Sequence, residues 1–378
     1  MKLEKNYAGV REAGMMLLAR VGDYVALETP TGDADALRRL SERIAERLQG
    51  MGASVTWYER EFGAQVVCRL AGSPGRESEQ PVVLLLHVDT VWPIGQLEAM
   101  PWRVVGTVAY GPGCFDMKGG IVVAEEAVSR LGNRSHRPII VVIVADEEIG
   151  SPSARAIIEE TVRDAHAVLG FEPPHPDGAL KTARWGSTRV RVSVVGRAAH
   201  AALDTTAGIS AIDELMDQLI RVREQTFGLS GVLCNIGTIR GGTRTNIVAE
   251  RAEAEIGLRF RDSDVEDEVL RRLEESRPVR TGARVSIDIV SNRPAWFATA
   301  QHDELLELAK LAGRSCGQKV SGRPARGAAD TNFTGRWGIP SIDGLGPIGR
   351  GAHAVDEQIV IASLNARVEL VTAILASL

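Results

Sequence analysis

Histidines and acidic residues that could bind metal ions are spread over most of this chain of 378 residues. Zinc in hydrolases takes imidazole and carboxylate ligands and keeps one coordination position open. Two such ions held close together can share a carboxylate and lower the pKa of a water molecule. These residue types therefore predict a two-metal hydrolase site. The candidate segments are His87-Val88-Asp89, Phe115-Asp116-Met117, Asp146-Glu147-Glu148, Phe171-Glu172-Pro173 and Ala352-His353.

Three of these segments follow runs of β-branched and aliphatic residues, at 82–86, 139–144 and 167–169. Such runs are typical of fully buried parallel strands. The carboxyl ends of parallel strands meet at one crevice, which is where open α/β sheets bind ligands. Any one of the histidines alone would more simply be a structural residue. Their shared position at strand ends favours convergence on one site.

The neighbours in these segments suggest how the tasks divide. Asp116 lies between the other candidates in sequence and opens a predicted helix, so it is suited to bridge two metals. Glu147 and Glu148 stand at one strand end, where one can bind metal while the other handles a proton. Asp89, two residues after His87, lies on the same side of an extended strand and can orient the imidazole.

The predicted elements indicate two domains. Amphipathic stretches at about 7–24 and 33–51 predict two helices, the second capped by Asp33. Strands and helices then alternate to about residue 172, and again after residue 300, which predicts a doubly wound α/β domain with a mostly parallel sheet. Between them the order is strand, helix, strand, strand, helix, strand, which is typical of an α+β domain with an antiparallel sheet. Its expected elements are 187–195, 208–225, 232–240, 246–260, 264–276 and 283–290.

We therefore expect a catalytic metal-binding domain formed by residues 1–180 and 294–378, with a dimerisation domain, residues 181–293, inserted into it. A length of 378 residues also favours two domains over one.

Composition excludes several classes of protein. The net charge of −5 argues against non-specific binding to nucleic acid, which needs a basic face. The four cysteines are far apart and form no Cys-x-x-Cys pair, so they do not suggest a disulfide framework. The sequence has no run of eighteen apolar residues, and its amino terminus lacks the apolar core of a signal peptide. These features predict a cytoplasmic protein that does not bind membranes.

Longer motifs around the candidate residues resemble those of the dinuclear zinc amidohydrolases. This family includes bacterial glutamate carboxypeptidase, aminoacylase, acetylornithine deacetylase and succinyl-diaminopimelate desuccinylase. The resemblance runs from about residue 10 to the carboxyl terminus, and Trp92-Pro93 and Asp343–His353 place it nearest the glutamate carboxypeptidase branch. The motifs are HVDTVWPIGQL, DMKGG, ADEEIGS, FEP, GRAAHA and DGLGPIGRGAHAVDE.

The resemblance implies two zinc ions per chain, for which cobalt can substitute. It gives Glu147 as the general base and Asp89 as the residue that tunes a histidine ligand. A glutamate at position 172 favours substrates with a free carboxylate. The implied ligands are His87, Asp116 and Glu172 for one zinc, and Asp116, Glu148 and His353 for the other.

The inserted domain carries further matches. His200 resembles a histidine that reaches across the dimer and polarises the scissile carbonyl in the partner's site. Guanidinium groups suit substrate carboxylates, and the residues that resemble such carboxylate-binding groups are Asn246, Arg259 and Arg293. Two departures bear on the substrate pocket. Trp185 stands where relatives commonly have lysine, and Arg326-Gly327-Ala328-Ala329 replaces a glycine-rich stretch.

Together these features predict a homodimeric zinc amidohydrolase or carboxypeptidase that acts on a small molecule with a free carboxylate. The expected substrate is an N-acyl amino acid or short peptide, with glutamate or aspartate on the leaving side. Glu147 would take a proton from water and return it to the amine, while His200 of the other subunit stabilises the oxyanion. The alternatives are a dipeptidase, an aryl-amine hydrolase, or an inactive metal-binding scaffold, against which the intact Glu147 argues.

Overall fold

The structure, a computed structural model, describes residues 2–204 and 206–378. The chain divides into two compact units. The first consists of the residues up to Ala183 together with Ala298–Ala325 and Ala329–Leu378. The second consists of Arg184–Phe297 and Arg326–Ala328.

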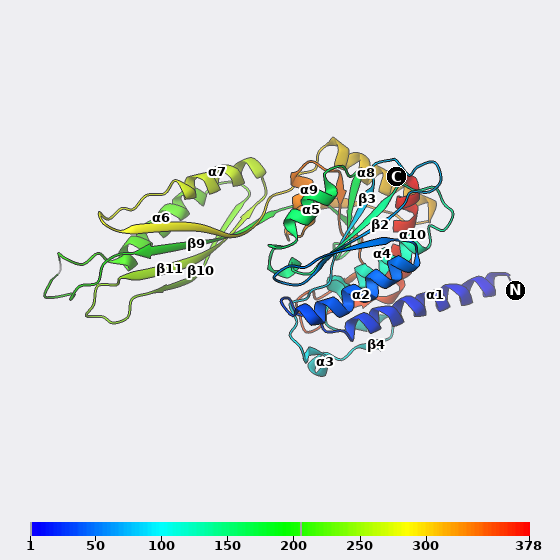
Figure 1. Ribbon diagram of the computed structural model, residues 1–378, viewed down its shortest axis with the longest axis horizontal. Coiled ribbons are helices and arrows are strands. Elements are labelled where there is room, and N and C mark those ends of the chain that lie inside the picture. Colours follow the sequence, from blue (N-terminus) through cyan, green and yellow to red (C-terminus); the bar gives the residue numbers. More distant parts are fainter. Residues whose placement is uncertain (1, 205) are drawn as a thin grey trace. The chain divides into compact units, whose positions relative to one another are not determined.

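A six-stranded, mostly parallel sheet forms the centre of the first unit (Figure 1). The strand order is β1-β2-β6-β3-β7-β14, in which β6, β3, β7 and β14 run parallel. The first two strands form an antiparallel hairpin along one edge. This sheet confirms the predicted α/β fold class. The strands are β1 Ser54–Tyr58, β2 Gln65–Leu70, β3 Val82–His87, β6 Ile139–Val144, β7 Ala167–Gly170 and β14 Ser341–Ile342.

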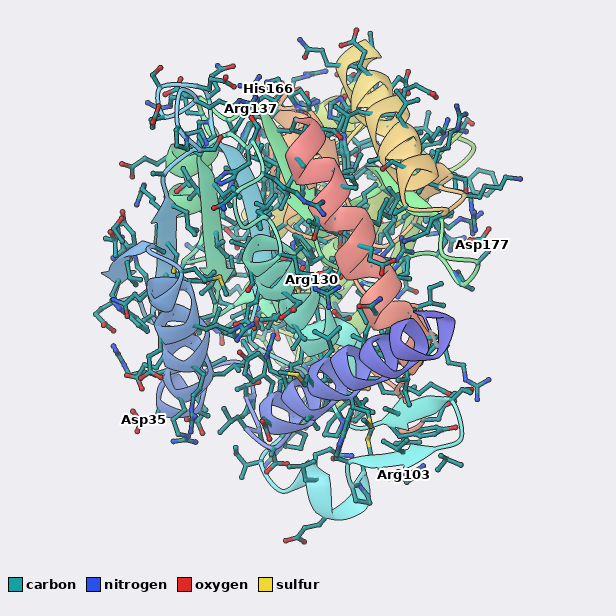
Figure 2. The ribbon with its side chains drawn as sticks, turned by 90° about the vertical axis from the view of Figure 1, so that its right-hand side faces the viewer. Asp35, Arg103, Arg130, Arg137, His166 and Asp177 are labelled. Carbon is teal, nitrogen blue, oxygen red and sulfur yellow. The ribbon has the colours of Figure 1, made fainter. Side chains whose placement is uncertain are left out.

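Both faces of the sheet are covered by helices. Helix α2 begins after Asp33, whose carboxylate accepts a hydrogen bond from the Ala36 amide at 3.0 Å, so the predicted cap is confirmed. Helices α4 and α10 lie side by side, and Arg130 donates a hydrogen bond across them to Asn365 at 2.9 Å (Figure 2). The helices of this unit are α1 Lys2–Val25, α2 Ala34–Gly50, α3 Gln96–Ala99, α4 Gly119–Ser129, α5 Arg155–Val162, α8 Ala300–Ser315, α9 Thr331–Arg336 and α10 Ile361–Ser377.

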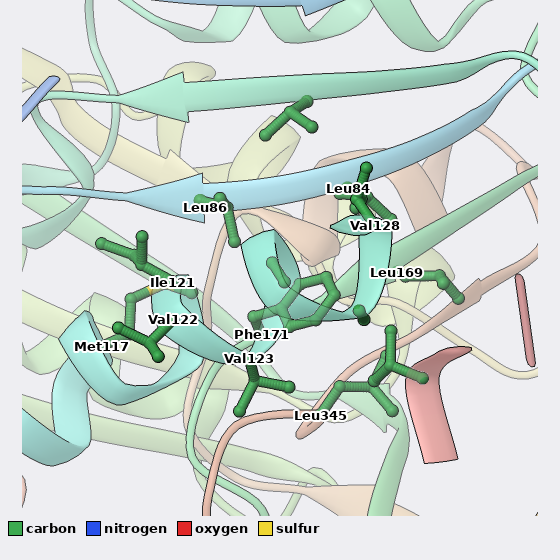
Figure 3. Packing of buried hydrophobic residues seen from close by; sticks show 14 of the residues in the cluster. Leu84, Leu86, Met117, Ile121, Val122, Val123, Val128, Leu169, Phe171 and Leu345 are labelled. Atoms are coloured by element: carbon green, nitrogen blue, oxygen red, sulfur yellow. The ribbon is translucent and has the colours of Figure 1, made fainter. Parts of the chain in front are cut away.

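The central strands are buried on both sides, which explains their continuous apolar runs. Leu84 and Leu86 of β3 belong to the same buried cluster as Ile121 of α4 (Figure 3). Val83 and Leu85 point to the opposite face and pack in a second cluster with residues of α5 and α9. Each such side chain contributes roughly 1.5–3 kcal/mol when it is fully buried. The ends of these strands are therefore a rigid edge on which to build a site.

Two smaller sheets of the first unit were not predicted. Their strands have two to five residues, which is too short for a periodic pattern to be visible. The four-stranded sheet, in the order β15-β16-β5-β4, places the segment that follows β5 beside the segment between β15 and β16. Asp116 lies in the first segment and His353 in the second. The strands are β4 Arg103–Val105, β5 Val108–Tyr110, β15 Gly349–Arg350 and β16 Gln358–Val360, and the separate ribbon is β8 Leu180–Arg184 with β13 Gly322–Ala325.

The second unit contains a four-stranded antiparallel sheet in the order β10-β11-β9-β12 and two helices. The predicted order of strands and helices is confirmed. Residues 246–250 were predicted as strand, which is wrong, because they form turns and a loop before Arg251. The elements are β9 Gly186–Val195, α6 Ala211–Thr226, β10 Val232–Gly241, β11 Arg251–Phe260, α7 Ser263–Glu274 and β12 Arg284–Arg293.

Within residues 2–204 and 206–378, no helix is both long enough and apolar enough to cross a membrane.

Candidate active site

Four of the predicted site residues lie at or just after the ends of three neighbouring strands. His87 is the last residue of β3, and Glu172 comes two residues after β7. Glu147 and Glu148 begin a single 3-10 turn, Glu147–Ile149, just after β6. Since β6, β3 and β7 are adjacent and parallel, their carboxyl ends bring these side chains to one edge of the sheet.

Asp116 lies between two histidines. On one side, His87 Nε2 is 3.3 Å from Asp116 Oδ1 and 3.3 Å from Glu172 Oε1. On the other side, His353 Nε2 is 3.4 Å from Asp116 Oδ2 and 3.1 Å from Glu148 Oε2. The two carboxylate oxygens of Asp116 thus face two different imidazoles, each of which has a second carboxylate beside it.

The carboxylates of the site favour positive charge. Hydrogen bonds with Asp116 and Glu148 raise the pKa of His353 to about 11. Burial disfavours the charged form of His87, yet hydrogen bonds with Asp116 and two further carboxylates hold its pKa well above the usual range. Burial likewise disfavours ionised Asp116, but the two imidazoles keep its pKa below the usual range. Surroundings that stabilise two protonated imidazoles also suit divalent cations in place of the protons.

The donor set fits divalent metal ions. The ligand atoms of His87, Asp116 and Glu148 lie within 4.8 Å of one another, and so do those of His87, Glu147 and Glu172. Imidazole nitrogens and carboxylate oxygens are the usual ligands of catalytic zinc. Because Glu147 belongs to the second set, proximity alone does not separate a metal ligand from a proton acceptor at this position.

Asp89 links His87 to the acidic pair. Nδ1 of His87 is 3.0 Å from the backbone oxygen of Asp89 and 3.4 Å from its Oδ1. The same carboxylate accepts hydrogen bonds from the backbone amides of Glu147 at 3.1 Å and Glu148 at 3.0 Å. The Thr31 hydroxyl donates to it at 2.8 Å. Asp89 therefore holds the acidic pair as well as the imidazole, and the sequence had suggested only the second contact.

Two buried acids near the site were not singled out from the sequence. Asp343, just after β14, accepts hydrogen bonds from the Glu172 amide at 3.3 Å and the Thr331 hydroxyl at 2.6 Å. Glu357, four residues after His353, accepts hydrogen bonds from the loop that carries Asp116. Both accept hydrogen bonds from backbone amides of segments that carry predicted ligands, so no residue type in the partner segment signals the contact. A further acid, Asp330, lines the small cavity formed by residues around His87.

In the second unit, the four predicted substrate residues form two pairs. His200 forms a β-bridge with Ile247, and the Ala201 amide donates to the Asn246 backbone oxygen at 3.0 Å. Arg259 and Arg293 both pair with Ser187, at the start of β9. The strand rises about 3.3 Å per residue, so roughly 26 Å separates Ser187 from the far end of β9, which precedes His200. The structure brings each pair together but not all four residues.

His200 has a defined tautomer. Its Nδ1 accepts hydrogen bonds from the amides of Ala202 at 3.2 Å and Leu203 at 3.1 Å. A ring nitrogen that accepts hydrogen bonds carries no proton, so the proton of the neutral ring lies on Nε2. The exposed edge of His200 is therefore a hydrogen-bond donor.

Arginines gather at the other end of the sheet. Burial and the neighbouring charge of Arg293 lower the pKa of Arg259. The two departures from the family pattern meet here, because the Arg326 guanidinium lies over the Trp185 ring at 5.5 Å. Arg184 donates a hydrogen bond to the Gly327 backbone oxygen at 2.6 Å and thereby fastens the same segment. This concentration of positive charge suits an anionic group.

Known proteins resemble the chain over most of its length. The profile of peptidase family M20/M25/M40 matches residues 83–377. Carboxypeptidase G2 from Pseudomonas sp. (strain RS-16) is 30% identical over 343 residues, which cover 87% of this chain and 81% of the relative. A succinyl-diaminopimelate desuccinylase from Methylorubrum extorquens is 29% identical over 358 residues, which cover 85% of this chain and 89% of the relative.

Solved structures share the fold. Aminopeptidase PepT from Bacillus cereus matches with a TM-score of 0.75 at 22% identity and covers 96% of this chain and 98% of its own. A dinuclear metal binding peptidase of the M20 family from Bacillus subtilis matches with a TM-score of 0.68 at 15% identity, covering 97% and 98%. The family profile spans well over half of the chain and agrees with the grouping of imidazoles and carboxylates at the sheet edge. The chain therefore belongs to peptidase family M20/M25/M40 and is a metal-dependent hydrolase.

Proposed function

We propose that this hydrolase is a two-zinc amidohydrolase that cleaves an N-acyl amino acid or short peptide and releases glutamate or aspartate by preference. The observation that carries the proposal is Asp116, whose two oxygens face His87 and His353 separately. One zinc would be held by His87, Asp116 and Glu172, and the other by Asp116, Glu148 and His353. Bound zinc or cobalt would lower the pKa of water and polarise the amide carbonyl.

In this proposal Glu147 moves the protons of the reaction. Its backbone amide donates a hydrogen bond to Asp89, which fixes the point in the backbone from which the Glu147 carboxylate reaches the proposed ligands. It takes a proton from the attacking water and gives it to the nitrogen of the leaving amine. His200 donates its Nε2–H to the oxygen of the scissile carbonyl, which agrees with the tautomer inferred from the two amides that donate to its Nδ1.

Substrate preference follows from the arginines. Arg259 and Arg293 would bind the free carboxylate of the leaving amino acid, with Asn246 as a further polar contact. Arg326, stacked on Trp185, supplies a third guanidinium near the same end of the sheet. Relatives commonly carry a lysine at the position of Trp185. Arg326 therefore supplies a positive charge in place of the one that is lost when tryptophan stands at this position. This arrangement supports acidic leaving groups over neutral ones.

We also propose that the enzyme is a homodimer in which residues 181–293 form the interface. A substrate two to three residues long spans roughly 7–11 Å, which is less than the distance between the His200 and Arg259 ends of one sheet. One substrate would therefore meet His200 and Asn246 of one subunit and the arginines of the other. Three apolar side chains of α6, four residues apart, support an interface: Ile212, Met216 and Ile220 are 37%, 52% and 55% exposed.

A substrate panel tests the proposal. Protein loaded with zinc, and separately with cobalt, is assayed on N-acyl glutamates, N-acyl aspartates, neutral N-acyl amino acids, dipeptides and aryl amides. We expect the acidic N-acyl amino acids to give the highest kcat/KM. Preference for dipeptides with a free amino group would indicate a dipeptidase instead. No hydrolysis of any substrate by fully loaded protein would indicate a scaffold.

A further inference from the structure

Glu357 is a buried carboxylate that collects four N–H donors. Its Oε1 accepts hydrogen bonds from the amides of Phe115 at 2.9 Å and Asp116 at 3.0 Å. Its Oε2 accepts from the Gly113 amide at 2.8 Å and from Trp92 Nε1 at 2.8 Å. The residue is 1% exposed, so water does not replace these contacts.

The donors and the acceptor come from three segments that each carry residues of the metal site. Trp92 follows the His87 segment, Gly113–Asp116 holds the shared carboxylate, and Glu357 follows His353 by four residues. The backbone conformation of the loop at Gly113 is restricted. The backbone there has φ of +70°, and a Cβ added to this glycine would lie 2.7 Å from the Thr90 side chain. One carboxylate thus ties together three parts of the chain that each carry residues of the proposed metal site.

We propose that Glu357 is a positioning residue that sets the separation between Asp116 and His353, and thereby the ability of the site to hold two metal ions. Asp116 contacts Glu357 through its own backbone amide, so movement of this carboxylate moves the residue whose two oxygens face the two imidazoles. Buried amides that lose a charged acceptor are costly to leave unpaired. Without Glu357 the loop would shift to find other acceptors. This inference rests on the proposed two-metal site.

Glu357→Gln tests it, because the amide group keeps the size of the side chain but turns one acceptor oxygen into a donor that faces two N–H groups. Metal-free protein is titrated with Co²⁺ and followed by visible absorption, which reports the number and geometry of bound ions. Substitution of a residue that orients a metal ligand typically lowers metal affinity about 10–100-fold. We expect the weaker Co²⁺ site of the variant to lose about tenfold or more in affinity, with an altered absorption band. In the zinc-loaded enzyme kcat falls while KM stays within about twofold.

Glu214→Gln is the matched control. Glu214 is also buried and accepts hydrogen bonds from two backbone amides, those of Val279 at 2.9 Å and Arg280 at 2.7 Å, but it lies in the second unit. We expect its Co²⁺ affinities to equal those of the unmodified protein. A similar loss in both variants would show a general effect of instability and overturn the proposal.

Trp92→Phe covers the case in which Glu357→Gln does not fold. It removes one of the four donors and keeps the carboxylate, so we expect a loss of about threefold in the weaker Co²⁺ affinity. Two ions bound with unchanged affinity in the folded variants would overturn the role of Glu357 alone. A single ion bound by the unmodified protein would overturn the two-metal site and this inference with it.

Discussion

At the scale of single residues, one carboxylate organises the site. Asp116 presents each of its oxygens to a different imidazole, and each imidazole has a further carboxylate on its other side. This arrangement holds protons in the absence of metal, because the acidic neighbours favour the charged form of both rings. Metal ions bound at the proposed ligands would therefore compete with protons, and a titration can measure that competition.

Metal binding should release protons. The pKa of His353 is raised to about 11 and that of His87 lies well above its usual range, so both rings are protonated at neutral pH before metal binds. Each ring must lose its proton to become a ligand. We expect about two protons to be released when the site fills, and metal affinity to fall as pH is lowered. Calorimetric titration with zinc in two buffers of different ionisation heat measures this number. Binding without proton release would contradict the assignment of both histidines as ligands.

The acidic pair should separate into two functions on substitution. Glu147→Ala is expected to keep both metals and the fold while kcat falls by about 10²–10⁴ through loss of the proton acceptor. Glu148→Ala is expected to lose a metal, because Glu148 is 3.1 Å from His353 at the second half of the site. Metal content by elemental analysis, measured beside kcat, checks both. If Glu147→Ala lost a metal and Glu148→Ala did not, the two roles would be reversed.

At the scale of helices and strands, sequence reasoning succeeded where the signal was an unbroken or periodic run. The strands β3, β6 and β7, which end at or shortly before His87, Glu147 and Glu172, were predictable, since burial on both faces favours apolar residues throughout. That made the convergence of their side chains predictable as well. The start of β11 at Arg251, five residues later than predicted, was not predictable from the pattern, because residues 246–250, apolar at 247–249, form a turn and a loop.

The contacts that fix the segments carrying the predicted ligands were not predictable in the same way. Thr31, Asp343 and Glu357 each bind a group that lies far away in sequence. Two of the three bind backbone amides, which every non-proline residue possesses, so the sequence shows only one half of each interaction. Short strands such as β15 and β16 decide which segments meet, and two or three residues carry no periodic signal.

A buried acid joins three helices outside the site. Glu125 of α4 accepts a hydrogen bond from Tyr24 of α1 at 2.8 Å, and Arg47 of α2 lies 3.6 Å away. Burial raises the pKa of Glu125 to about 7, although Tyr24 and the arginines oppose the rise. The folded state thus favours the protonated form, relative to a value of about 4.3 in the unfolded chain. Its contribution to stability is full below that value and is lost as pH rises through about 7.

Glu125→Gln mimics the protonated acid at every pH. Relative to the unmodified protein, we expect the variant to gain in free energy of unfolding between pH 5 and pH 8, since it does not pay the cost of a buried negative charge. Urea unfolding of the metal-free proteins at the two pH values measures the difference. An equal difference at both pH values would contradict a raised pKa for Glu125.

At the scale of the whole molecule, the second unit raises the question of which chain completes which site. Its two candidate pairs, His200 with Asn246 and Arg259 with Arg293, lie at opposite ends of the same sheet. A single small substrate cannot contact both ends of one sheet. The proposed dimer resolves this by taking one pair from each subunit. In such a dimer the exposed apolar side chains of α6, Ile212, Met216 and Ile220, could pack against the same side chains of the other subunit.

Mixed dimers test the sharing of residues between subunits. His200→Ala and Glu147→Ala are each expected to be nearly inactive, since loss of one oxyanion donor costs about 10²–10³ in kcat and loss of the base about as much or more. In a dimer with one chain of each kind, one site would own an intact Glu147 and receive an intact His200 from its partner. We expect purified heterodimers to regain about half of the unmodified activity, and an equal mixture after random subunit exchange to regain about a quarter.

The control carries both substitutions on one chain and pairs it with an unmodified chain. If His200 acts across the dimer, this mixture has one site without a base and one site without a partner histidine, so its heterodimers should be inactive. If His200 acts within its own chain, the unmodified chain keeps a complete site and the heterodimer keeps about half of the activity, whereas the first mixture recovers none. The heterodimers are purified through different tags on the two subunits. The two models then predict opposite results for each heterodimer: the one that is active under the first model is inactive under the second. The result therefore decides whether the separated pairs of the second unit serve one active site or two.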